Sequence, residues 1–544
     1  MRKLKDQLGE ARITDTDPTR KLTRKFQTTL SKLRKERKVD SKLFFEMYPS
    51  DAVPPRMYGM VKAHKPQKDY PMRAVVSTIG TPMYGTSKYL VNLLQPTLNK
   101  NDTRLRNSTS FVDKARTWNI DASEHQVSFD VTALYPSVPI KKAIDAIMDM
   151  LQADFDSVSS RTNLSLLDIK NLLELCLGTC YFMFDDHIYT IEDAGPIGLS
   201  LMVVIAEGYL QHIESNALRN AITNGCGPLS YLRYVDDSHA RFEIETQVDE
   251  FLLELNQQDP RIQYTVDREE NGCLPFLDVR VINNRQGKYE FDVYRKDAIT
   301  NVQLKPHSSI NPRIFNSVFK GFLVRANRIC SEKYLEQELN FLVNVFAENG
   351  HNKSKLEEMV RSHLNPVDTI IPRVKPDYSK LVKIPWIPKI GPKLRKIYQR
   401  QGIKVIFTST PNLSDILCNH KCKLPKNSRP GVYKVPCKCS KAAYVGETKK
   451  RISTRVKEHA KDVFHGRWDS SGLAQHAKCC TEEFDYECTA TLAVEENRYK
   501  RRTREALEIR RHETAPGMSC ASNRDRGALK SESWNALLAK IKAV

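Results

Sequence analysis

The feature that most constrains this chain is a pair of adjacent carboxylates, Asp236 and Asp237, placed directly after a short apolar stretch. Residues 229–235 precede the pair and residues 238–242 follow it. Their β-branched and aromatic residues favour two strands, and the acidic pair lies where a tight turn would join them. Two negative charges in so small a volume repel each other unless they share a cation, and Mg²⁺ prefers such oxygen ligands. The sequence therefore predicts a hairpin with a magnesium site at its turn; the alternative is an ordinary acidic surface turn.

A third carboxylate supports the metal site. Asp130 ends a short apolar stretch that begins at Val127. An aspartate at a strand end and Asp236 on a nearby turn would make a two-metal site for in-line phosphoryl transfer. Asp130 is also suited to cap a helix that begins at Val131, and the two interpretations are compatible.

Together these acidic motifs resemble the palm of reverse transcriptases. The resemblance implies that Asp130 and Asp236 bind both Mg²⁺ ions, that the Val131 carbonyl adds a ligand, and that Asp237 supports the turn. It also implies that Tyr135, five residues after Asp130, is the bulky residue that excludes a ribose 2′-hydroxyl.

Length and charge indicate a multidomain protein that binds a polyanion. A chain of 544 residues exceeds the size of one hydrophobic core and predicts two to four domains. No apolar run approaches the ~20 residues that a bilayer span needs, and the N-terminus lacks the apolar core of a secretory signal. We therefore expect no membrane association. The net charge of +20 favours nucleic acid as the partner; the alternative is that the charge serves solubility alone.

The N-terminal region combines a basic helical stretch with a predicted hairpin. Residues 1–50 are charged and helix-prone, and their basic face is expected to contact a phosphate backbone, although a solvated surface is the alternative. Two short strands follow, joined by a polar loop at 66–70. Lys65 and Arg73 would converge from this hairpin on the triphosphate of a nucleotide.

This hairpin also carries a family resemblance. Tyr-Gly-x-x-Lys-x-His-Lys-Pro at 58–66 and Pro-x-Arg-x-Val-x-Ser at 71–77 resemble the fingers of Penelope-like element reverse transcriptases. Asp-Val-x-x-Leu-Tyr-x-x-x-Pro at 130–139 and Pro-Phe-Leu-Asp-Val at 275–279 fit the same family. The resemblance runs from about residue 50 to the end. It implies an α+β right-hand polymerase, with fingers and palm at 51–300, a helical thumb at 301–365, a linker, and a small α/β nuclease domain.

A glycine-rich turn precedes an apolar helix in the middle of this region. Residues 140–190 have a helical pattern, and the segment 195–200 opens a helix at 201–214. Gly198 permits close backbone approach, and in the resembling family this loop lies beneath the incoming nucleotide. The usual Gly-Ser-Pro is replaced here by Gly198-Leu199-Ser200.

Asp278 lies in a predicted pair of strands, 275–282 and 289–294, joined by hairpin-type residues. A two-metal site is already complete without a fourth acid. Strand alternation also places Arg280 on the same face as Asp278. We therefore predict that Asp278 is structural, with Arg280 as its partner.

Residues 366–428 differ in composition from the regions on either side. Prolines recur and basic residues strongly outnumber acidic ones between 365 and 405. This pattern predicts a basic linker that contacts nucleic acid and has no core of its own.

The C-terminal part contains a second set of chemically active residues. Tyr433 and Tyr444 lie on short β-prone stretches, Gly431-Val432-Tyr433 and Tyr444-Val445-Gly446. Arg455 follows on a predicted helix, 449–463, and Glu505 on another, 499–512. These are the components of a one-metal nuclease, in which a base activates water, arginine neutralises the phosphate, and the carboxylate holds a divalent ion.

Residues 429–544 resemble the GIY-YIG endonuclease that is attached to Penelope-like elements. The resemblance implies that Tyr433 is the base or its relay, that Tyr444 positions the water, and that Glu505 binds one Mg²⁺. Glu508, one turn later, is the rival metal ligand, and Asn523 is a further candidate site residue.

Cysteines concentrate in this C-terminal region. Eight of the 13 fall between Cys418 and Cys520, and they are expected to be thiols or metal ligands. Thiolate and imidazole donors suit tetrahedral Zn²⁺. The predicted zinc ligands, which match the resembling nucleases, are Cys437, Cys439, His459 and His476. Alternatives are Cys418 with Cys422 as a competing pair, and Cys479 or Cys480 in place of a histidine.

These features predict a nuclear retroelement protein with two activities. Its nuclease would nick target DNA, and its polymerase would extend the free 3′-hydroxyl with deoxynucleoside triphosphates on element RNA. Two alternatives remain: a telomerase-like enzyme that extends existing ends, and a nucleic-acid-binding scaffold with a decayed enzyme core.

Overall fold

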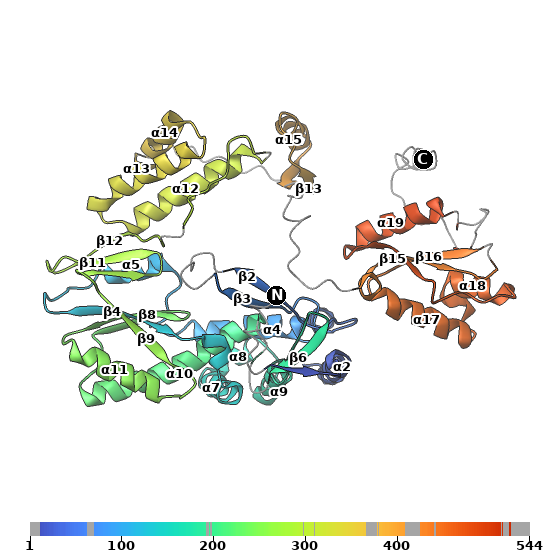
Figure 1. The fold of residues 1–544 in the computed structure, drawn as a ribbon, viewed down its shortest axis with the longest axis horizontal. Helices are drawn as coiled ribbons and strands as arrows, with labels where there is room; N and C mark the ends of the chain where they lie inside the picture. Colours follow the sequence, from blue (N-terminus) through green and yellow to red (C-terminus); the bar gives the residue numbers. More distant parts are fainter. Residues whose placement is uncertain are drawn as a thin grey trace. The chain divides into compact units, whose positions relative to one another are not determined.

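The computed structural model of the chain divides into two compact units (Figure 1). The first unit contains residues 1–48 and 54–421, and the second contains 49–53 and 422–544. The described residues are 11–61, 70–191, 195, 198–296, 299–308, 310–365, 378, 380–408, 425–439, 442–512, 514 and 522–523. Within these ranges, no helix is both long and apolar enough to cross a membrane.

A five-stranded sheet occupies the first part of the N-terminal unit, in the order β1-β6-β5-β2-β3. Its β2-β3 pair is the predicted hairpin, with Arg56 opposite Ser77 and Val61 opposite Met72. The strands are β1 (Arg12–Thr14), β2 (Arg56–Val61), β3 (Met72–Ser77), β5 (Cys180–Phe184) and β6 (His187–Ile191).

Helices precede and follow this hairpin in sequence. The helical prediction for 140–190 is correct up to Leu177 and wrong for β5 and β6. There, aromatic and β-branched residues form a hairpin, and Asp185 and Asp186 adopt positive φ angles of 50° and 61° at its turn. The helices are α2 (Thr19–Lys35), α3 (Ser41–Met47), α4 (Tyr84–Leu98), α5 (Ser108–Ala115), α7 (Ile140–Ala153), α8 (Phe155–Ser159) and α9 (Leu166–Leu177).

A four-stranded antiparallel sheet, in the order β7-β8-β4-β9, carries the acidic motifs. Phe129 and Phe242 on this sheet and Phe251 on the helix after β8 are fully buried in one continuous hydrophobic core. Burial of such side chains stabilises the sheet on which the site is built. The elements are β4 (His125–Val131), α6 (Leu134–Ser137), α10 (Ser200–Asn224), β7 (Ser230–Tyr234), β8 (Asp237–Phe242), α11 (Thr246–Gln257) and β9 (Tyr264–Arg268).

A three-stranded sheet follows, and then the predicted helical region. The strand expected at 275–282 is interrupted, because Leu277 has a positive φ of 57° and turns the chain between β10 and β11. The elements are β10 (Cys273–Phe276), β11 (Val279–Asn283), β12 (Tyr289–Val293), α12 (Pro312–Ile329), α13 (Glu332–Glu348) and α14 (Lys353–Leu364).

The described part of the predicted linker is folded. Residues 380–408 form β13 (Lys380–Pro385), α15 (Gly391–Arg400) and β14 (Ile403–Thr408). The two strands are parallel, which requires a crossover connection, and α15 supplies it. Prolines fit these short elements because Pro385 ends β13 and Pro392 lies in the first turn of α15.

The C-terminal unit contains a three-stranded antiparallel sheet in the order β16-β15-β17. The predicted helices at 449–463 and 499–512 are present as α17 and α19, with bounds shifted by up to three residues. The elements are η2 (Lys426–Ser428), β15 (Gly431–Pro436), β16 (Ala443–Thr448), α17 (Ile452–Phe464), η3 (Trp468–Ser470), α18 (Gly472–Cys479), β17 (Ala490–Val494) and α19 (Arg498–Arg511).

Candidate functional site

The three predicted carboxylates meet at one end of the β7-β8-β4-β9 sheet. Antiparallel pairing of β4 with β8 places Asp130 opposite Asp237. Asp236 lies in the β7-β8 turn, and its carbonyl accepts a hydrogen bond from the Val131 backbone N–H at 3.3 Å. The alternative that Asp130 caps a helix at Val131 is wrong, because α6 begins at Leu134.

Charge crowding at this cluster shows in the pKa of Asp237. Burial and the nearby carboxylates of Asp236 and Asp130 raise the pKa of Asp237 to about 6, although the positive charge of Lys296 opposes this rise. Asp267 on β9 adds to the negative charge. Neither Lys296 nor Asp267 is predicted from the sequence, because both are far from the acidic turn along the chain and only the tertiary fold brings them near Asp237. A metal ion would relieve the repulsion among these carboxylates.

We predict that Asp237→Asn stabilises the metal-free protein at pH 7.5. The folded-state pKa of about 6 exceeds the ordinary 3.8, so the folded protein binds the extra proton and loses stability as the pH rises through this interval. Asparagine has no carboxyl group to ionise, so the variant does not lose stability in this pH interval. Allowing for solvent screening, we expect a gain on the order of 1 kcal/mol at pH 7.5. Urea denaturation in EDTA at pH 5 and pH 7.5 measures it. The gain should be smaller at pH 5, and a variant that is less stable than wild type at pH 7.5 would contradict the prediction.

Tyr135 lies beside the acidic turn, as its predicted role requires. Ala133 has a left-handed backbone with φ 49°, which reverses the chain after β4 and starts α6. Burial and the charges of Asp236 and Glu207 raise the pKa of Tyr135. Tyr135 is half-buried next to these carboxylates. Because its pKa is raised, its hydroxyl stays protonated at neutral pH.

The structure describes only some of the residues that are predicted to contact the nucleotide. Arg73 is exposed on β3, opposite Met60, whereas Lys65 lies outside the described residues. Gly198 has φ +80°, and a Cβ atom there would lie 1.9 Å from the carbonyl oxygen of Val76 on β3. Only glycine therefore allows this turn to lie against the strand that carries Arg73.

A buried ionic network lies beneath the acidic turn. Arg233 is fully buried, and its guanidinium contacts Glu207 at 3.0 Å and Glu214 at 2.7 Å. The same guanidinium donates to the carbonyl of Val235 in the turn at 2.9 Å. Removing one member of such a network typically costs about 3–5 kcal/mol. The sequence does not predict the burial of Arg233, because its partners lie 19 and 26 residues away on α10.

Asp278 is structural in the sense predicted, but its predicted partner is wrong. It forms an ion pair with Arg325 of α12 at 2.6 Å and accepts a hydrogen bond from Ser108. Arg280 instead pairs with Asp292 across the β11-β12 ladder. The turn at Leu277 removes Asp278 from the strand face that alternation assigned to it.

In the C-terminal unit, the predicted nuclease residues surround the hydroxyl of Tyr433. Tyr433 is fully buried on β15. Burial and the charge of Tyr444 raise the pKa of Tyr433, and the charges of Arg455 and Glu505 also act on it. Four predicted site residues from two strands and two helices are thus brought together.

Two glycines make this arrangement possible. A Cβ atom on Gly446 would lie 2.7 Å from the Tyr433 hydroxyl and 2.7 Å from a ring carbon of Tyr444. A Cβ atom on Gly431 would lie 2.1 Å from the Ala493 carbonyl on β17. Gly446 is therefore needed for the close packing of the two tyrosines, and Gly431 is needed for the close approach of β15 to β17.

His459 is the main correction to the predicted zinc site. Its Nε2 lies 2.8 Å from the Tyr433 hydroxyl, and its Nδ1 lies 3.1 Å from the Ser471 hydroxyl. Burial and the charge of Arg455 lower the pKa of His459 to about 4. Both ring nitrogens are engaged in hydrogen bonds, so this neutral histidine belongs to the tyrosine site and not to the cysteines.

The two candidate glutamates on α19 differ clearly. Glu505 is half-buried, and its carboxylate accepts a hydrogen bond from the Glu447 backbone N–H at 3.0 Å. Glu508 is only 2% exposed and forms an ion pair with Arg504 at 2.7 Å. Glu505 is the carboxylate beside Tyr433, which favours it as the metal ligand.

Asn523 braces the strand that carries Tyr444. Its side-chain amide donates to the Val445 carbonyl at 2.7 Å and accepts from the Val445 N–H at 3.1 Å. The described contacts of Asn523 therefore indicate a positioning role.

A separate group of four donors could hold a metal ion: Cys437, Cys439, His476 and Cys480. Their ligand atoms all lie within 4.8 Å of one another. Among the residues that the structure describes, the buried Nε2 of His476 has no hydrogen-bond partner. This donor set fits a tetrahedral metal site. Cys480 takes the place predicted for His459, Cys479 is exposed outside the group, and Cys418 and Cys422 lie outside the described residues.

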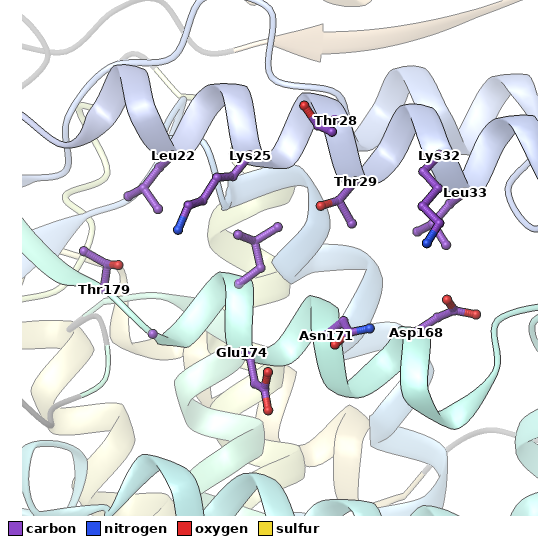
Figure 2. Close-up of a pocket in the computed structure, with 12 residues that line it drawn as sticks. Leu22, Lys25, Thr28, Thr29, Lys32, Leu33, Asp168, Asn171, Glu174 and Thr179 are labelled. Carbon is purple, nitrogen blue, oxygen red and sulfur yellow. The ribbon is translucent and has the colours of Figure 1, made fainter.

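Away from these sites, a groove of about 520 Å³ separates α2 from α9 (Figure 2). Lys25 and Lys32 of α2 line it from one side, and Asp168 and Glu174 of α9 line it from the other. These opposite charges do not favour a polyanion in the groove. The adjoining surface of α2 is more strongly basic, with Arg20, Lys21 and Arg24, and fits the predicted phosphate contact better.

Comparison with known proteins gives partial matches. Residues 302–358, which include α12 and α13, match the family described as animal helix-turn-helix domain. No curated protein matches the sequence.

Among solved structures, the chain is similar to telomerase from Candida albicans in complex with a TWJ fragment of telomeric RNA. The identity is 8% over 66% of this chain and 68% of that chain, with a TM-score of 0.41. The corresponding Candida tropicalis complex has 12% identity, 58% and 53% coverage, and a TM-score of 0.35. The RNA-dependent RNA polymerase of bacteriophage phi12 has 13% identity, 62% and 59% coverage, and a TM-score of 0.34.

Proposed function

We propose that the N-terminal unit is an RNA-directed DNA polymerase. The observation that carries this proposal is the pairing of Asp130 with Asp237 across β4 and β8, with Asp236 in the adjoining turn. Three carboxylates at one sheet end, with a raised pKa at Asp237, are an arrangement that divalent cations would stabilise.

Asp130 and Asp236 would hold two Mg²⁺ ions, and the Val131 carbonyl would add a ligand. These ions would supply charge stabilisation for the attacking and leaving oxygens of the phosphoryl transfer. Arg73 would neutralise the triphosphate, and the ring of Tyr135 beside Asp236 would exclude a 2′-hydroxyl. Arg233 holds the turn from below through Val235.

We propose that the C-terminal unit is a DNA endonuclease of the GIY-YIG type. The hydrogen bond between Tyr433 and neutral His459 supports a relay, in which the tyrosine accepts a proton from water as it passes its own to the imidazole. Arg455 would neutralise the phosphate, and Tyr444 would position the water. Glu505 would hold one Mg²⁺, which would polarise the phosphate.

We propose that the two sites work together in a Penelope-like retroelement protein, which would act in the nucleus. The nuclease would nick target DNA, and the polymerase would extend the new 3′-hydroxyl on element RNA. The test incubates purified protein with element RNA, a labelled DNA target, deoxynucleotides and Mg²⁺.

Nicked and extended products together are the expected result. Extension of a pre-formed end without nicking would favour the telomerase-like alternative, and nucleic-acid binding without either product would favour the scaffold. Product extended only with ribonucleotides would contradict a DNA polymerase.

We further propose that Zn²⁺ occupies the site formed by Cys437, Cys439, His476 and Cys480. We predict about one Zn²⁺ per chain. Cys480→Ser should lose it as fully as Cys437→Ser, because a structural tetrahedral site needs all four donors. Elemental analysis after dialysis measures the metal.

The matched control for this prediction is Cys488→Ser, since Cys488 is exposed and lies outside the four-donor group. His459→Gln should also keep its Zn²⁺. Loss of metal from His459→Gln with retention in Cys480→Ser would restore the ligand set expected from the sequence.

A further inference from the structure

The β13-α15-β14 unit has an unusual charge. Residues 378–408 contain eight lysines and arginines and no aspartate or glutamate. Such an imbalance in 31 residues attracts a polyanion through release of its counterions. No part of the catalytic sites uses these residues.

Aromatic and basic side chains of this unit line a pocket of about 270 Å³. Trp386 and Phe407 form its apolar part, and Arg395 and Lys396 of α15 line it as well. Arg313, from the first turn of α12, completes a set of three cations. Cations around an aromatic surface are the features with which proteins bind an unpaired base and its phosphates.

Trp386 is held in a fixed position. Its backbone N–H donates to the Thr408 carbonyl at 2.9 Å, and its ring meets Phe407 edge-on with centroids 4.9 Å apart. A Cβ atom on Gly391 would lie 2.8 Å from two ring atoms of Trp386, so glycine permits close packing of α15 against the indole. The ring remains half-buried and is pre-organised for stacking.

The other face of the strand pair, opposite Phe407 by strand alternation, also carries basic side chains. Leu381 is 54% exposed and lies opposite Lys404, while Ile406 is 36% exposed and lies opposite Lys383. Aliphatic side chains alternate there with ammonium groups. A nucleic-acid strand, whose phosphates carry negative charge, fits such a surface better than a purely apolar partner does.

We propose that this unit, together with the first turn of α12, binds a single strand of nucleic acid. One base stacks on Trp386, and the adjoining phosphates contact Arg395, Lys396 and Arg313. The proposal rests on the proposed function only in taking nucleic acid as the partner. Binding is measured without Mg²⁺ or nucleotides, so its outcome does not depend on either catalytic activity.

The test uses the full chain in EDTA with fluorescein-labelled oligouridine, oligothymidine and a blunt duplex of equal length. Fluorescence anisotropy should show that Trp386→Ala raises the Kd for the single strands about tenfold, as expected for loss of one stacked base. Trp386→Phe should restore most of the affinity. Arg395→Ala with Lys396→Ala should also weaken binding and reduce the slope of log Kd against log salt by about 1.4.

The matched control is Lys353→Ala with Lys355→Ala, which removes the same charge from exposed positions on α14 and should leave the Kd within about twofold. Photo-crosslinking with 4-thiouridine or 4-thiothymidine should label Trp386, and the tighter of the two arms identifies RNA or DNA. An unchanged single-strand Kd in Trp386→Ala, or an equal loss of duplex binding, would overturn the proposal. So would displacement of both oligonucleotides by polyglutamate with no effect of Trp386→Ala, because that points to an acidic protein partner.

Discussion

Asp236→Ala will abolish nucleotide addition and leave DNA nicking intact. Asp236 lies in the turn beside Asp130 and Asp237. In the proposed site its carboxylate would hold both metal ions, and alanine would supply no ligand in its place. Loss of several kcal/mol of charge stabilisation corresponds to a decrease on the order of a thousandfold or more in rate. Extension of a DNA primer annealed to RNA measures synthesis, and cleavage of a supercoiled plasmid measures nicking. The predicted nuclease residues lie in the other compact unit, so nicking should persist.

The matched control is Asp267→Asn, which removes another negative charge that acts on Asp237. This acid is not a proposed ligand, so synthesis should fall by less than about tenfold. A folded Asp236→Ala protein that loses both activities would contradict the assignment of two independent sites, and near-normal synthesis would remove Asp236 from the metal site.

Glu505→Gln should lose nicking by roughly a thousandfold while it retains DNA affinity. The substitution keeps the shape of the side chain and removes the anionic oxygen that would bind the single metal. Affinity should persist because it depends on many contacts to phosphate and is salt-dependent. Synthesis on a pre-annealed primer should also persist, since that substrate needs no nick.

Glu508→Gln is the companion variant on the same helix. Glu508 is buried and paired with Arg504, so its loss should lower the free energy of unfolding and leave nicking of the folded protein nearly unchanged. If Glu508→Gln abolishes nicking and Glu505→Gln does not, the metal ligand is Glu508.

Local patterns in the sequence predicted the acidic hairpin well. The turn between β7 and β8 follows from β-prone residues around an acidic pair, and the β2-β3 hairpin follows from similar signals. Such elements are determined by neighbours in the chain. The β5-β6 hairpin is not predicted, because its apolar residues continue the apolar pattern of the preceding helix.

Sites that depend on distant partners were predicted less well. Cys480 and His459 are both chemically suitable ligands, and only the packing of α17 and α18 separates them. The burial of Arg233 likewise cannot be predicted without knowing that α10 packs against its strand, because an arginine in a strand ordinarily faces solvent. The residue types in the sequence indicate which side chains can bind a metal ion. Only the tertiary contacts show which of them lie together.

Helix α10 connects two parts of the N-terminal unit that are far apart in sequence. It starts two residues after Gly198, which lies against β3, and its Glu207 and Glu214 hold Arg233 beneath the acidic turn. A helix of this length is a rod of roughly 37 Å. It joins the turn that lies against the strand carrying Arg73 to the buried network that supports the turn carrying Asp236. A substitution at Gly198 that shifts the start of the rod should consequently alter the Mg²⁺ concentration needed for synthesis.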